Sequence, residues 1–181
     1  MTTREDELAV LARGLDQAAG IVDTVDESDL ARSTPCADWT VSALVDHLVV
    51  APERFAQMVR GEEVDWSGPA PSRGDHRGEE LRRGAADLME AWQGVGSNDT
   101  PMGPDWQSAE VAIHTYDLVA ALGRPTDGLD QEVADRGLAF MRANLKPEMR
   151  EPAFGAEHTA PEDADAYERI AAFAGRAVAA G

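Results

Sequence analysis

The chain has 181 residues, of which 43% are hydrophobic, and its 34 acidic and 16 basic residues give a formal net charge of −18. This length and composition indicate a globular protein with a real core, and we expect a single domain over residues 1–181. A strongly acidic surface repels phosphates and anionic lipids, and no apolar run is long enough to span a bilayer. We therefore expect neither nucleic acid nor a membrane as a partner.

The cysteine count and the N-terminus indicate the compartment. Cys36 is the only cysteine, so no disulfide can form within the chain. The chain runs directly into Arg4, Glu5 and Asp6 without the apolar segment that a signal peptide needs. We expect a cytoplasmic protein.

Apolar residues recur at helical spacing in six segments of the chain. The expected helices are Glu5 to about Asp23, Trp39 to Arg60, His76 to Gln93, Asp105 to Leu122, Asp130 to Leu145, and Pro161 to about Val178. No run alternates as a half-buried strand does, and only 6% of the residues are aromatic. The predicted fold class is all-α, with a four-helix bundle formed by the first four helices and additional C-terminal helices packed alongside.

Capping residues mark several of these helix ends. Gly61 and Gly123 predict the ends of the second and fourth helices. Capping-box spacing predicts two helix starts, at Thr2 with Glu5 and at Thr159 with Glu162.

Three polar residues share one ridge of the fourth helix. Glu110, His114 and Asp117 follow one another at intervals of four and three residues, which stacks them on the same face. The second helix carries His47, whose neighbours one turn away are all apolar: Ala43, Leu44, Val50 and Ala51. We therefore expect His47 to face the interior, toward the other helices.

Together these residues form a candidate metal site. Facing helices of a bundle build metal sites in their shared core. His47, Glu110 and His114 supply two imidazole nitrogens and a carboxylate oxygen, which suits zinc and leaves a fourth position open. Asp117 would orient His114 by accepting its hydrogen bond. The alternative stays open, because such a spacing also arises by chance and a histidine among apolar neighbours can be a satisfied core residue.

The remaining reactive side chains have weaker patterns. Cys36 precedes the second helix, where it is either a nucleophile with a lowered pKa or a small buried residue in a turn. His76 and His158 are expected in solvent. The tryptophans are expected to anchor the core or the loops: Trp39, Trp66, Trp92 and Trp106.

Two motifs resemble a known family. Residues 34–41 (TPCADWTV) and 44–48 (LVDHL) resemble the TPC-x-x-W-x-V-x-x-L-x-x-H stretch of actinobacterial DinB-like proteins. These are relatives of the metal-binding domain of mycothiol-dependent maleylpyruvate isomerase. Residues 110–123 (EVAIHTYDLVAALG) resemble that group's E-x-x-x-H-x-W-D-L-x-x-A-x-G, with Tyr116 in place of the usual tryptophan.

The resemblance implies a DinB-type bundle and a divalent metal, usually zinc, at His47, Glu110 and His114. It also implies a small-molecule thiol such as mycothiol, an electrophilic substrate, and compatibility with a homodimer. The isomerase has an additional C-terminal domain that contributes to catalysis. We expect this chain to be too short to hold such a domain, and the resemblance therefore does not establish isomerisation of maleylpyruvate.

Three functions therefore remain open. The first is a metal-dependent thiol transferase or isomerase, in which a thiolate attacks an electrophilic carbon; activated water at the same position would instead make a hydrolase. Its general base is unassigned among Asp46, Asp117 and His76. The second is a non-catalytic metal-binding or sensing module, and the third is a metal-free helical bundle.

Overall fold

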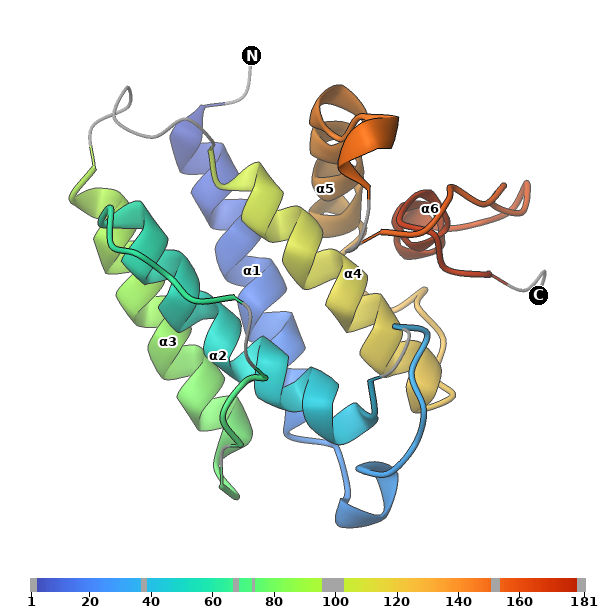
Figure 1. Ribbon diagram of the computed structural model, residues 1–181, viewed down its shortest axis with the longest axis horizontal. Helices are drawn as coiled ribbons and strands as arrows, with labels where there is room; N and C mark the ends of the chain where they lie inside the picture. Colours follow the sequence, from blue (N-terminus) through green and yellow to red (C-terminus); the bar gives the residue numbers. More distant parts are fainter. Residues whose placement is uncertain are drawn as a thin grey trace.

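The computed structural model describes residues 3–36, 39–66, 69–72, 74–95, 103–150 and 154–178, and this part is helical (Figure 1). Its elements are α1 (Arg4–Val22), η1 (Glu27–Asp29), α2 (Val41–Val59), α3 (Arg77–Gln93), α4 (Asp105–Ala121), α5 (Gln131–Asn144), η2 (Pro147–Met149) and α6 (Ala166–Phe173). Within these residues there is no strand, only an isolated bridge between Ser33 and Thr40. The all-α prediction is confirmed. None of the described helices is both long and apolar enough to cross a bilayer.

The first four helices form the bundle. Both α1 and α2 pack against α3 and α4, while α5 packs on α4, and α6 packs on α4 and α5. Figure 1 shows α5 and α6 beside α4, on the side away from α2 and α3. The two C-terminal helices thus lie alongside the bundle, as the sequence predicts.

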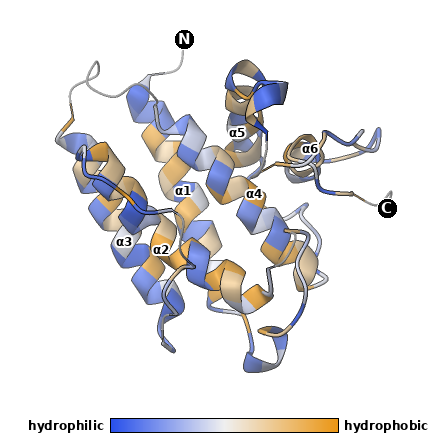
Figure 2. Ribbon diagram, viewed as in Figure 1, coloured by the Kyte–Doolittle hydropathy of each residue, from blue (hydrophilic) through white to orange (hydrophobic). Residues whose placement is uncertain are grey.

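Helix α4 is buried on both sides because two apolar cores meet on it. One core joins α1, α2 and α3 to Val111 and Leu118 of α4. The other joins Ala112 and Ile113 of α4 to α5 and α6. Figure 2 shows hydrophobic and hydrophilic stretches alternating along these helices, and the hydrophobic residues of both cores are buried. Polar residues on such a helix must find partners, because a buried polar group without a hydrogen bond is costly.

The first five helices begin and end within two residues of the predicted positions. The first start differs in its cap: Thr2 lies outside the described residues, and Thr3 caps α1 in a capping box with Asp6. Gly61 and Gly123 follow their helices with φ of 78° and 67°. This left-handed conformation strongly favours glycine, so both predicted stops are confirmed.

The predicted extent of the last helix was wrong. Helix α6 begins after Asp165, which caps it. The Asp165 side chain accepts a hydrogen bond from the backbone N–H of Glu168, and the Glu168 side chain accepts one from the backbone N–H of Asp165. This capping box replaces the expected one at Thr159, because residues 161–164 form a turn in which Ala164 N–H donates to the Pro161 carbonyl. The helix ends early because Gly175 turns the chain at φ 91°.

Candidate metal centre

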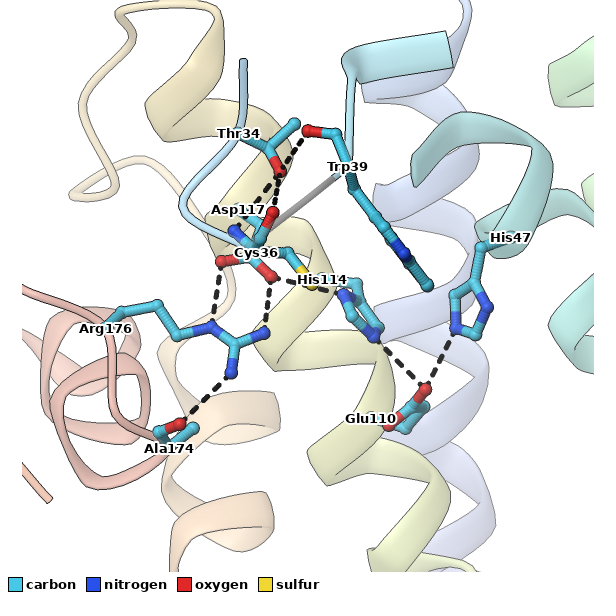
Figure 3. Close-up of polar contacts among 9 residues, drawn as sticks. All are labelled: Thr34, Cys36, Trp39, His47, Glu110, His114, Asp117, Ala174 and Arg176. Carbon is cyan, nitrogen blue, oxygen red and sulfur yellow. Dashed lines mark hydrogen bonds and ion pairs between the residues drawn. The ribbon is translucent and has the colours of Figure 1, made fainter. Parts of the chain in front are cut away.

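Helices α2 and α4 bring His47, Glu110 and His114 together (Figure 3). The Oε1 atom of Glu110 lies 2.9 Å from His47 Nε2 and 3.2 Å from His114 Nε2. One potential ligand atom from each residue lies within 4.8 Å of the others. Both imidazoles therefore present the same ring nitrogen to one carboxylate oxygen, so that two nitrogens and an oxygen converge.

The three side chains differ in exposure. His114 lies deepest, with 9% of its side chain exposed, against 13% for His47 and 25% for Glu110. Within the part of the chain that is described, no fourth histidine, cysteine or carboxylate joins this set. His114 is thus the most buried residue of the cluster, and Glu110 is the one most accessible to solvent.

Charges within the cluster compensate one another. Burial raises the pKa of Glu110, but the charge of His114 and the hydrogen bonds from both imidazoles outweigh it and hold the pKa well below its usual value. Burial lowers the pKa of His114, yet the Glu110 charge and the Asp117 hydrogen bond raise it to about 9. Without a metal, His114 is an imidazolium paired with two carboxylates, so a metal binding there must displace a proton.

Behind His114, a second pair of charges fixes its ring. His114 Nδ1–H donates to Asp117 Oδ2 over 3.2 Å. Arg176 donates two hydrogen bonds to the same carboxylate: Nε donates to Oδ1 over 3.1 Å, and Nη2 donates to Oδ2 over 2.8 Å. Burial raises the pKa of Asp117, but the hydrogen bonds from His114 and Arg176 outweigh it and lower the pKa. Asp117 therefore stays ionised and holds the proton on Nδ1, which leaves Nε2 directed at Glu110.

The loop before α2 adds two side chains to the site. The Trp39 ring stacks on His114, with centroids 5.4 Å apart, and lies 4.8 Å from the His47 ring. Cys36 has a potential ligand atom within 4.8 Å of those of His114 and Asp117, in a second group separate from His47 and Glu110. Cys36 thus lies on the Asp117 side of His114 (Figure 3), at the start of a turn in which the Trp39 N–H donates to its carbonyl.

Other candidates lie elsewhere. His76 is exposed at the start of α3, where its Nδ1 is 3.6 Å from Glu79, and His158 is exposed in a loop. Asp46 is buried on α2 but belongs to neither group of potential ligands in the described residues.

Sequence reasoning missed the contacts of Trp39 and Arg176. Trp39 stands in the same motif as Cys36 and His47, which was a usable signal. Arg176 is 59 residues from Asp117 in the sequence, so no spacing pattern could connect them.

Comparison with known proteins places the site in a family context. A family model described as "Mycothiol maleylpyruvate isomerase N-terminal domain" matches residues 11–118, more than half of the chain. Two "uncharacterized" proteins of Mycobacterium tuberculosis, Rv0738 of strain ATCC 25618 / H37Rv and MT0763 of strain CDC 1551 / Oshkosh, are each 29% identical over 189 aligned residues. The alignments cover 96% of this chain and 99% of each relative. No solved structure matches the chain. The matched segment includes His47, Glu110 and His114.

Proposed function

Because the chain belongs to the mycothiol maleylpyruvate isomerase N-terminal domain family, we propose that it binds zinc through His47, Glu110 and His114 and acts as a thiol transferase. The observation that carries the proposal is the convergence of both Nε2 atoms on Glu110 Oε1, at 2.9 and 3.2 Å. The thiol is a low-molecular-weight one such as mycothiol, and the second substrate is an electrophile.

The residues present suit a divalent metal. Two imidazoles and one carboxylate form a donor set that catalytic zinc sites use, with one position left for a ligand from solution. The hydrogen bond from His114 to Asp117 supplies the outer partner that ligating imidazoles usually have. A structural site would be closed by a fourth protein ligand, and within the described residues Cys36 belongs to a different group. This donor set supports an open, substrate-binding site over a structural one.

A metal in this site would stabilise the thiolate of a bound thiol near neutral pH. Such a thiolate would attack the electrophilic carbon, with the new C–S bond forming as the leaving group departs with the electrons of the broken bond. The thiol proton passes to solvent. Asp117 and Arg176 hold the His114 ring in place throughout, and Trp39 covers that ring against water.

Metal content tests the ligands. Protein purified without chelator is expected to contain about one zinc per chain, and His47→Ala and His114→Ala each to lose most of it. His76→Ala is the matched control, because His76 is exposed and belongs to neither group of potential ligands in the described residues. Equal metal content in all four proteins would overturn the assignment.

Turnover tests the reaction. The zinc-loaded protein is expected to conjugate an electrophile with mycothiol and to lose this activity when the thiol is left out. Stoichiometric zinc without any thiol-dependent turnover would overturn the transferase and favour a binding or sensing module.

A further inference from the structure

A pocket of about 390 Å³ opens beside Glu110, between α2, α4, α5 and the segments that follow α2 and α5. Aromatic side chains build much of its wall: the Phe55 ring lies 4.9 Å from the Trp106 ring and 6.0 Å from the Trp66 ring. Phe140 and Phe154 complete this aromatic lining. The pocket is of the size and character that bind small molecules, and Glu110 places it next to the proposed metal site.

The charge of this pocket restricts what it can bind. Among the described residues that line it, Glu110 is the only charged one, and Asn144 is the only other polar one. No lysine, arginine or histidine of the lining set is available to pair with an anion. A carboxylate placed there would lose its hydration and find no cationic side chain among the described lining residues, which is unfavourable. An uncharged apolar group instead gains free energy by leaving water.

A second pocket, of about 370 Å³, has His47 in its wall, whereas Glu110 lines the first pocket. Its lining mixes polar and apolar side chains and includes the charged residues Asp46 and Arg54. Trp66 borders both pockets, and the Arg54 guanidinium lies 5.3 Å from the Trp66 ring. Since His47 Nε2 and Glu110 Oε1 are 2.9 Å apart, ligands in the two pockets would meet at the same centre.

We propose that the apolar pocket beside Glu110 binds an uncharged apolar group of the electrophilic substrate, an aromatic ring or a branched alkyl chain. The pocket beside His47, whose wall also holds Asp46 and Arg54, is then left for the thiol. This inference rests on the proposed function and adds the class of its second substrate. A dicarboxylate such as maleylpyruvate would find no cationic side chain among the described lining residues of this pocket.

Calorimetric titration with 2-naphthol, an uncharged aromatic, tests the pocket in protein treated with chelator and kept free of thiol. We expect saturable binding at one site per chain and no measurable binding of maleate. The variant Met149→Lys/Asn144→Lys places two cations at the exposed rim, and it is expected to weaken 2-naphthol at least about tenfold and to gain maleate binding. Trp66→Ala removes an exposed wall and is expected to weaken 2-naphthol as well.

Glu148→Gln is the matched control. It also makes the net charge more positive and is adjacent to Met149, but Glu148 does not line the pocket. Its affinity for 2-naphthol is expected to match that of the unmodified protein. The proposal is overturned if 2-naphthol fails to bind, or if the double variant binds it with unchanged affinity. Because the titration needs neither metal nor thiol, naphthol binding without zinc or turnover would instead overturn only the proposed function.

Discussion

A series of ion pairs connects Arg176, in the segment after α6, with three charged residues of α4, the last of which lies beside α2. Arg176 pairs with Asp117, Asp117 with His114, and His114 with Glu110. Each charge is compensated by the next, which matters because a buried ion without its partner is strongly destabilising. Because Asp117 accepts from Nδ1 of His114, it is Nε2 of His114 that faces the proposed metal.

Asp117 is predicted to raise metal affinity without binding the metal. In Asp117→Asn the neutral amide stabilises the ligating imidazole less, and zinc affinity is expected to fall about 10- to 100-fold. Asp127→Asn makes the same substitution at an exposed position, and it is expected to leave the zinc affinity unchanged. Competition with a chromophoric chelator measures both variants. Equal affinities would show that Asp117 has no part in the site.

Arg176 is predicted to support the same carboxylate. Arg176→Gln leaves Asp117 buried with 0% exposure and without its bidentate partner, so unfolding free energy is expected to fall by about 3–5 kcal/mol. Arg176→Gln/Asp117→Asn removes both charges and is expected to lose less than the sum of the single changes. Urea denaturation supplies the double-mutant cycle, and strict additivity would contradict the coupling.

Stability of the metal-free protein is predicted to depend on His114. The folded protein holds the His114 proton to about pH 9, against an ordinary pKa of 6.5. This contribution is therefore fully present below about pH 6.5 and is lost as the pH rises through about 9. Urea denaturation in chelator should show a fall over this range that His114→Gln lacks. An identical pH dependence in the two proteins would contradict the buried imidazolium.

The residues of the site were only partly predictable. Helical spacing set Glu110, His114 and Asp117 on one ridge, because that geometry is local. The position of His47 beside Glu110 depended on the packing of α2 on α4, which the apolar neighbours of His47 suggested. The bond between Arg176 and Asp117 depended on a turn at Gly175, and no local pattern announced it. That the three residues bind metal stays a prediction.

At the scale of elements, close packing of α5 on α4 holds the helix that carries the site. A Cβ at Gly137 of α5 would lie 2.7 Å from the Cα of Ala109, directly before Glu110. No side chain atom fits at that distance, so the two helices can approach this closely only with glycine there.

Gly137→Ala is therefore predicted to push α5 from α4 and to lower the unfolding free energy by about 1–3 kcal/mol. Gly20→Ala on α1 is the control, since nothing lies within 4 Å of its added Cβ and alanine favours a helix by about 0.5–1 kcal/mol. Thermal unfolding should shift down in the first variant and up in the second. A shift of the same sign in both would contradict this account of the interface.

Helix positions were predictable where amphipathic spacing is strong. Helix α2 follows its apolar stripe from Val41 to Val59 and ends before Gly61. The start of α6 was not predictable in this way, because two nearby pairs, Thr159 with Glu162 and Asp165 with Glu168, both have the spacing of a capping box. The choice of Asp165 over Thr159 follows from the turn at residues 161–164, a non-local outcome that the sequence pattern alone does not decide.

For the whole molecule, the site lies where the four-helix bundle and the C-terminal helices share α4. The proposed metal would join α2 to α4, and of the two pockets beside it one is mainly apolar and the other is mixed. The formal net charge of −18 favours the approach of a cation over that of an anion. This agrees with a metal centre that serves an uncharged substrate.

X-ray absorption on the zinc-loaded protein, before and after mycothiol is added, tests the central claim most directly. The account predicts only nitrogen and oxygen ligands at first, with two imidazoles among them, and then one new sulfur at about 2.3 Å when the thiol binds. A sulfur ligand already present in the protein alone would mean that Cys36 closes the site. That result, or a ligand shell unchanged by the thiol, would contradict an open thiol-binding centre.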